Sequence, residues 1–194
     1  MNNLLYSAHP SPCMKNYELL GSAIMGILTG NPKDEPLHYG EVFGIWTNLA
    51  TNNGLIAAYQ TFINHTGDKD LVKIIEESIQ CMKDENKQVE IILKINGIGL
   101  PPAPPERPDA RLEDIPVGAR FNDPEISAAL SMDSAAGLVA CSQVMGMCIR
   151  EDIALMYGQF HLGKAQLGAK LLRLNKDKGW LVPPPLYLNS PDQE

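Results

Sequence analysis

The stretch LPPAPPERP, residues 100–108, decides the fold, because it separates two pairs of helix-like segments. Each proline removes a backbone donor and restricts the residue before it, so the stretch is predicted to be extended. Together with its neighbours it forms a connection over residues 98–121, which in polyproline II form reaches roughly 74 Å. A helix of about 28 residues is only about 42 Å long. The connection is therefore long enough to run the whole length of a helical bundle.

Apolar side chains recur at helical spacing on both sides of this connection and predict four helices. The predicted helices cover about residues 35–66, 69–96, 123–147 and 150–178. Pro36 and Pro124 stand where proline is favoured, at the first position of a helix. The links within each pair are short, and short links join antiparallel neighbours.

These features predict an all-α, antiparallel four-helix bundle of the ferritin-like kind. One long crossover between the second and third helices distinguishes ferritin-like bundles from simple up-and-down bundles. The alternative is a flexible linker between two separate hairpins, but each hairpin alone would expose an apolar face. The bundle domain is predicted at 31–188, after a loosely ordered extension at 1–30 and before a tail at 189–194. A sharp change in character after Gly30 favours Met25 as the biological start.

Composition and charge argue against several classes of function. The chain of 194 residues carries a formal charge of −7, so it lacks the clustered Lys and Arg that bind nucleic acid. Residues 42–66 hold no Asp, Glu, Lys or Arg, but their several Asn and Gln favour a buried helix over a membrane span. The first residues lack a basic n-region and are interrupted by Pro10 and Pro12. We therefore expect no secretory signal and a cytoplasmic location.

A ferritin-like bundle raises the question of a di-iron centre. Such a centre takes a Glu from each of two helices and a Glu-x-x-His pair from each of the other two. The sequence departs from this pattern, because Gly158 stands three residues before His161 and Phe62 stands three residues before His65. We therefore do not expect a di-iron oxidase or a ferritin.

A site for one divalent metal ion is the weaker possibility. His38 and Glu41 are three apart and would share a helix face, and His161 on the last helix could add a third ligand. The competing interpretation is that His38 and Glu41 form a solvated first turn, while His161 is a hydrogen-bonded core residue. Its partner would be one of three polar side chains. These are Asn48, Asn52 and Asp133.

Other polar residues offer little chemistry. Asn48, Asn52, Asn53 and Gln60 could line a polar pocket, or they could satisfy one another or lie at the helix boundary. Cys141 has no His at a spacing that would activate it, and no phosphate-binding loop of the Walker type is present. No nucleophilic catalysis is therefore indicated, and no cofactor is expected apart from the metal ion considered above.

Several motifs of the chain occur together in one known family. They are AAGLVACSQ (135–143), IREDI (149–153), GQFH (158–161), LRLNK (172–176), KGW (178–180), the proline-rich stretch and NDPE (122–125). The chain resembles, over residues 25–188, an uncharacterised family of endospore-forming bacteria that is distantly similar to spore coat protein F. The resemblance implies a ferritin-like bundle and a link to the spore coat, and it supplies no activity and no catalytic residues.

We therefore predict a non-catalytic structural or interaction protein of the spore-forming cell. Its bundle surface or its proline segments would bind a protein partner or a second copy of the chain. Its expected location is the cytoplasm, the spore or the spore coat. The alternative is a metal-binding or redox bundle that uses His161 and Glu41.

Overall fold

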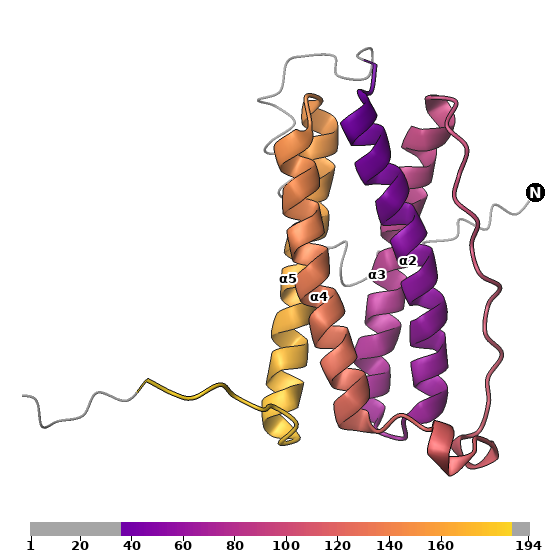
Figure 1. Cartoon of the computed structure of the whole chain (residues 1–194), viewed down its shortest axis with the longest axis vertical. Helices are drawn as coiled ribbons and strands as arrows, with labels where there is room; N and C mark the ends of the chain where they lie inside the picture. The colour runs from indigo at the N-terminus through magenta and orange to yellow at the C-terminus, as the bar shows by residue number, and fades with distance from the viewer. Residues whose placement is uncertain (1–35, 188–194) are drawn as a thin grey trace, which may run out of the picture.

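The structure is a computed structural model that describes residues 36–187. This part of the chain forms four long helices and no strand (Figure 1). The helices are α2 (Tyr39–His65), α3 (Lys69–Ile95), α4 (Asp123–Met147) and α5 (Glu151–Asp177), with the short 3₁₀ helices η2 (Leu112–Asp114) and η3 (Val117–Ala119) between α3 and α4. The predicted extension at 1–30, the proposed start at Met25 and the tail at 189–194 lie outside the described residues.

The first long helix, α2, begins later than the sequence predicts, at Tyr39 rather than near residue 35. His38 is its N-cap, because the His38 Nδ1 atom accepts a hydrogen bond from the Gly40 N–H at 2.9 Å. The Glu41 carboxylate in turn accepts a bond from the His38 N–H at 3.1 Å. This reciprocal capping box sets the start of the helix, and Pro36 stands outside it.

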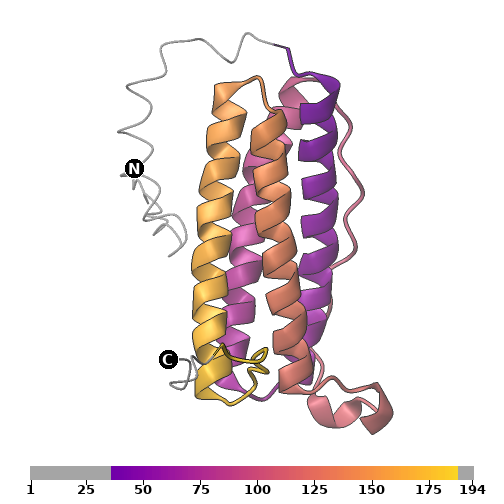
Figure 2. The same ribbon diagram turned by 60° about the vertical axis from the view of Figure 1, so that its left-hand side comes forward.

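The helices are arranged as two hairpins with a long return between them. Residues 66–68 join α2 to α3, and residues 148–150 join α4 to α5. From the end of α3, residues 96–122 run back along α2 to the opposite end of the bundle, where α4 begins (Figures 1 and 2). α2 also packs on α4, and α3 on α5, so each helix is antiparallel to its neighbours. The predicted four-helix bundle with a proline-rich crossover is confirmed.

Hydrogen bonds from α2 hold the crossover against the bundle. Trp46, Gln60 and Asn64 face it, and their side chains bond to its backbone. The bonds join Trp46 Nε1 to the Gly99 oxygen (3.0 Å), the Arg107 N–H to Gln60 Oε1 (3.0 Å), and Asn64 to both the Pro108 oxygen (3.0 Å) and the Ala110 N–H (3.1 Å). The crossover is therefore a fixed part of the fold and not a flexible linker.

Two apolar clusters fill the bundle, one toward each end. The first includes Ile45, Leu49, Val89, Leu93, Val144, Ile153 and Phe160, and the second includes Tyr59, Leu71, Ile75, Met82, Ile126, Leu130 and Leu171. Between the two clusters, α2, α3 and α5 contribute polar side chains at one level. We call Asn52, Glu85, Asn86 and Lys164 the polar layer. Among residues 36–187, no helix is both long enough and apolar enough to cross a membrane.

Candidate functional site: a pocket beside the polar layer

A buried ion pair forms the centre of the polar layer. The Lys164 Nζ atom lies 2.7 Å from each carboxylate oxygen of Glu85. The side chains are only 14% and 8% exposed, respectively. Asn52 Nδ2 donates to Glu85 Oε2 and to Asn86 Oδ1, both at 3.0 Å. Because each charge is removed from water, the pair is tolerable only when both partners and their hydrogen bonds are present.

A glycine on α4 makes room for this lysine. A Cβ atom added at Gly137 would lie 2.9 Å from the Cδ atom of Lys164. Real Cβ atoms almost never make so close a contact, so any larger residue at this position would displace the lysine stem. Gly137 is therefore a small residue of α4 that the polar layer requires.

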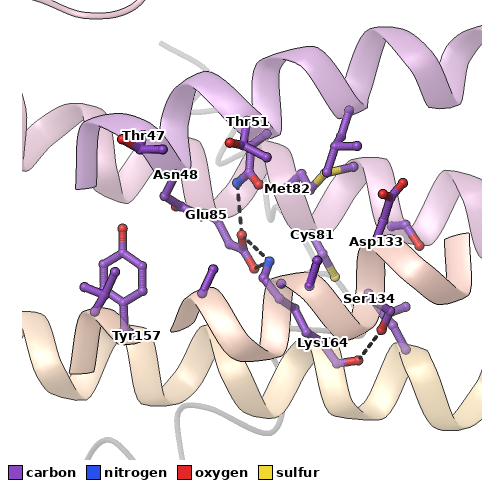
Figure 3. Close-up of a pocket in the computed structure, with 18 of the residues that line it drawn as sticks. Thr47, Asn48, Thr51, Cys81, Met82, Glu85, Asp133, Ser134, Tyr157 and Lys164 are labelled. Carbon is purple, nitrogen blue, oxygen red and sulfur yellow. Dashed lines mark hydrogen bonds and ion pairs between the residues drawn. The ribbon is translucent and has the colours of Figure 1, made fainter. Parts of the chain in front are cut away.

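A pocket of about 450 Å³ lies beside the polar layer and is lined by all four helices (Figure 3). Its volume falls in the range of ligand pockets, which are typically about 300–1,000 Å³. Most of its wall is apolar, with Leu55, Met82 and Val144 among the lining residues. Exposed lining residues come from α2 and α4, so the pocket opens between these two helices. These residues are Phe43, Thr47, Thr51, Ala136, Ala140, Gln143 and Met147.

Two buried polar atoms in the pocket wall have no hydrogen-bond partner. They are the side-chain oxygen of Asn48, on α2, and the hydroxyl of Tyr157, on α5. Tyr157 is fully buried, and burial, with smaller contributions from Cys141 and Glu85, raises its pKa far above the usual value. The hydroxyl is therefore neutral and can both donate and accept. Buried polar groups are normally paired, so two unpaired ones in one cavity need an explanation.

A second tyrosine of the pocket wall is satisfied. The Tyr59 hydroxyl donates to Asp133 Oδ2 at 3.4 Å. Burial raises the pKa of Tyr59 and also that of Asp133. The contrast with Tyr157 shows that the fold can supply a partner for a buried tyrosine of this pocket.

The free thiols near the pocket are not activated. Burial raises the pKa of the Cys141 and Cys148 thiols to about 11. A nucleophilic cysteine needs the opposite shift, toward the thiolate. Neither thiol therefore supplies a nucleophile at neutral pH.

The structure brings together two of the three residues predicted to bind a metal ion. His38 Nε2 lies 3.8 Å from Glu41 Oε2. Glu41 is fully buried, in contrast to the solvated turn considered from the sequence, and its Oε1 atom accepts bonds from the Ile149 and Arg150 N–H groups at 2.9 Å. His38 Nδ1 accepts a bond from backbone, and His38 Nε2 bonds to the Met147 oxygen at 2.9 Å. These bonds tie α2 to the α4–α5 connection and occupy both side chains.

The third predicted ligand, His161, lies elsewhere on α5. It is eleven residues beyond Arg150, which corresponds to about 16 Å along the helix. It is half-buried, and Asn52 and Asp133, two of its suggested partners, bond to other side chains. Within the described residues no group of three or more His, Cys, Asp or Glu side chains is placed to hold a metal ion. The single-metal site stays a prediction.

The four polar residues noted on α2 divide between two pockets. Asn48 and Asn52 line the pocket beside the polar layer. Asn53 and Gln60 line a smaller one, of about 280 Å³, under the crossover. The Asn53 oxygen accepts a bond from Asn86 at 2.9 Å, so part of the set is satisfied by α3 rather than by its own members.

Sequence reasoning missed Glu85, Lys164 and Tyr157, although a signal for two of them is present. The apolar stripe of α3 is interrupted between Met82 and Val89, and that of α5 between Phe160 and Leu167. Glu85 and Lys164 fall in these two gaps. Gaps at the same height on two helices would have indicated a polar layer.

The comparisons with known proteins place the chain in a family. Residues 25–192 match the family described as "Protein of unknown function (DUF3231)". The chain belongs to this family. It is 60% identical over 164 residues to a DUF3231 relative from Bacillus subtilis (strain 168), "Uncharacterized protein YvdQ", and this match covers 84% of the chain and 96% of the relative.

Two solved structures resemble the DUF3231 bundle described above. One is a Bacillus halodurans C-125 protein described as a "putative spore coat protein", with 68% identity and a TM-score of 0.81 over 82% of this chain and all of that one. The other is a conserved hypothetical protein, rv2844, from Mycobacterium tuberculosis, with 12% identity and a TM-score of 0.58 over 71% of this chain and 98% of that one. The second likeness concerns the fold alone.

Proposed function

We propose that the protein is a non-catalytic binding protein of the spore-forming cell and that it associates with the spore. The binding role is inferred from the pocket of about 450 Å³. The two charged side chains of its polar layer, Glu85 and Lys164, neutralise each other. A wide apolar cavity with a few convergent polar groups is the usual form of a binding site.

The bonding of the polar layer favours binding over catalysis. A general base needs a lone pair that can reach the substrate's proton. Both oxygens of Glu85 accept bonds from Lys164, and one also accepts a bond from Asn52. The Lys164 Nζ atom is in turn engaged by both of these oxygens, so it is not free to attack a substrate.

Association with the spore rests on the relative from Bacillus halodurans, which is described as a "putative spore coat protein". Its identity of 68% over 82% of this chain supports a shared role. The order of the helices and the long crossover support a wider relationship with ferritin-like bundles, which share this connectivity.

Fractionation of sporulating cells tests this proposal. Antibodies against the full chain would be used on vegetative cells, on the mother-cell lysate and on coat extracts of purified spores. We expect the protein in the coat extract and little of it in vegetative cells. Equal amounts in vegetative cells together with none in spores would contradict the spore association.

A further inference from the structure

We propose that the pocket binds a small, neutral, amphipathic molecule that carries a hydroxyl group, and that this hydroxyl lies between Asn48 and Tyr157. The inference deepens the binding role proposed above and rests on it. It concerns the class of ligand, which the family and its relatives leave open.

The position of the two unpaired atoms points to one shared partner. In Figure 3 the Tyr157 hydroxyl points from α5 toward α2, the helix that carries Asn48. Both residues line the same pocket, and neither atom has a hydrogen-bond partner. The proposed ligand places one group between these two atoms, where it would give each of them a partner.

The chemistry of the two atoms favours a hydroxyl group. The amide oxygen of Asn48 can only accept, and the tyrosine hydroxyl can donate. A ligand hydroxyl can donate to Asn48 while it accepts from Tyr157. A ligand hydroxyl also suits an Asn48 amide whose oxygen and nitrogen are exchanged, because a hydroxyl can accept a bond from the amide nitrogen. A carbonyl group or an ammonium ion can perform only one of these two roles.

The charges in the pocket favour a neutral ligand. Lys164 neutralises Glu85, so neither offers an unopposed charge to a ligand. Asp133 is the remaining carboxylate in the pocket wall, and it accepts the Tyr59 hydroxyl. A charged head group held by Asn48 and Tyr157 would therefore find no unopposed counter-charge in Glu85 or Lys164.

The rest of the pocket fits an apolar body. Its apolar lining comes from all four helices and includes Leu55, Met82, Leu130, Val144 and Leu167. Burial of such a body would supply most of the affinity, since apolar area removed from water contributes about 25 cal/mol per Å². The hydroxyl would then orient the molecule.

The binding of 1-octanol to the full chain, measured by isothermal titration calorimetry, tests the proposal. 1-Methoxyheptane has a similar length but no donor, and octanoate and octylammonium carry charges. We expect 1-octanol to bind with one molecule per chain, about tenfold more tightly than any of the other three. The ether and octanoate cannot donate to the Asn48 oxygen, and octylammonium brings an uncompensated charge into the pocket. Equal affinity for the alcohol and the ether would overturn the proposal.

Two variants locate the site. Tyr157→Phe and Asn48→Leu should each weaken 1-octanol binding by about three- to tenfold, the usual effect of one lost hydrogen bond. Tyr187→Phe, at an exposed position that is not part of the pocket, should leave it unchanged. Unchanged affinity in both pocket variants would overturn the proposal. If the alcohol binds but is recovered as another compound, the pocket assignment stands and the non-catalytic role fails.

Discussion

Glu85 and Lys164 are 79 positions apart in the sequence, yet the Lys164 ammonium lies 2.7 Å from both carboxylate oxygens of Glu85. The pair joins α3 to α5, which belong to different hairpins. A contact of this kind ties the second half of the bundle to the first. It also sets the charge balance of the pocket beside it.

Removal of one member of this pair should destabilise the fold strongly. Glu85→Gln or Lys164→Met leaves a buried partner without its counter-charge, at a cost of about 3–5 kcal/mol in the free energy of unfolding. The double variant should recover much of this loss, because no unpaired charge remains. Urea unfolding of the single and double variants measures both effects.

The exposed pair of Lys83 and Glu106 is the matched control. These side chains are 40% and 79% exposed and lie 3.3 Å apart. Glu106→Gln should therefore change the stability by less than about 1 kcal/mol. A loss as small as this in Glu85→Gln would contradict the structural role given to the buried pair.

Tyr157→Phe should make the ligand-free protein more stable. The Tyr157 hydroxyl is buried without a partner, and the desolvation of such a group is unfavourable. Its removal should raise the free energy of unfolding by about 1 kcal/mol. Tyr59→Phe, which removes a hydroxyl bonded to Asp133, should lower it by about the same amount. Thermal and urea unfolding of the two variants give the comparison, and a loss in Tyr157→Phe would show that this hydroxyl has a partner in solution.

Glu41 should be essential for the end of the bundle where α2 begins. Its carboxylate accepts bonds from the N–H groups of His38, Ile149 and Arg150. Glu41→Ala leaves these groups unsatisfied and should lower the free energy of unfolding by about 3 kcal/mol or more. Glu125, in the exposed capping box of α4, offers a matched residue whose change to Ala should cost only about 1 kcal/mol. Similar losses in both variants would contradict the structural role of Glu41.

Metal ions should compete with the bonds made by His38 and Glu41. A metal ion on these side chains would have to displace backbone N–H groups and the Met147 oxygen. We therefore expect zinc or manganese to leave the Tm of the full chain unchanged or to lower it. A near-stoichiometric metal content, with a raised Tm that His161→Gln abolishes, would instead support the metal site predicted from the sequence.

The protein should lose stability in alkaline solution. Burial raises the pKa of the Cys141 thiol from 9.0 to about 11. Above pH 9 the unfolded chain therefore releases a proton that the folded chain still holds, and the free energy of unfolding falls as the pH rises toward 11. The contribution of Cys141 to this fall in the free energy of unfolding approaches about 1.4 kcal/mol per pH unit. Urea unfolding at pH 7, 9 and 10 should show a shallower fall in Cys141→Ala, and an unchanged slope would contradict this account.

Much of the fold could be predicted because the deciding signals are local. Prolines at 101–108 exclude a helix, and Asn122 with Glu125 caps α4 where the sequence indicates. The start of α2 could not be predicted in the same way. His38 is an uncommon N-cap, and it is favoured here partly because its ring also bonds to Met147, which is 109 positions away.

The site was harder to predict than the fold, because its features depend on contacts between helices. The gaps in the apolar stripes mark Glu85 and Lys164 as unusual, but they do not reveal that the two form a pair. Nothing in the sequence around Tyr157 distinguishes a paired hydroxyl from an unpaired one. That property depends on the side chains that α2 places opposite α5.

Native mass spectrometry of the full chain purified from sporulating cells tests the central claim most directly. The claim is that the pocket beside the polar layer holds a neutral, hydroxyl-bearing molecule. We predict a mass greater than that of the bare chain, an extractable neutral compound with a hydroxyl group, and the loss of this compound in Tyr157→Phe but not in Tyr187→Phe. The mass of the bare chain in all three proteins, under conditions that keep the bundle folded, would contradict the claim.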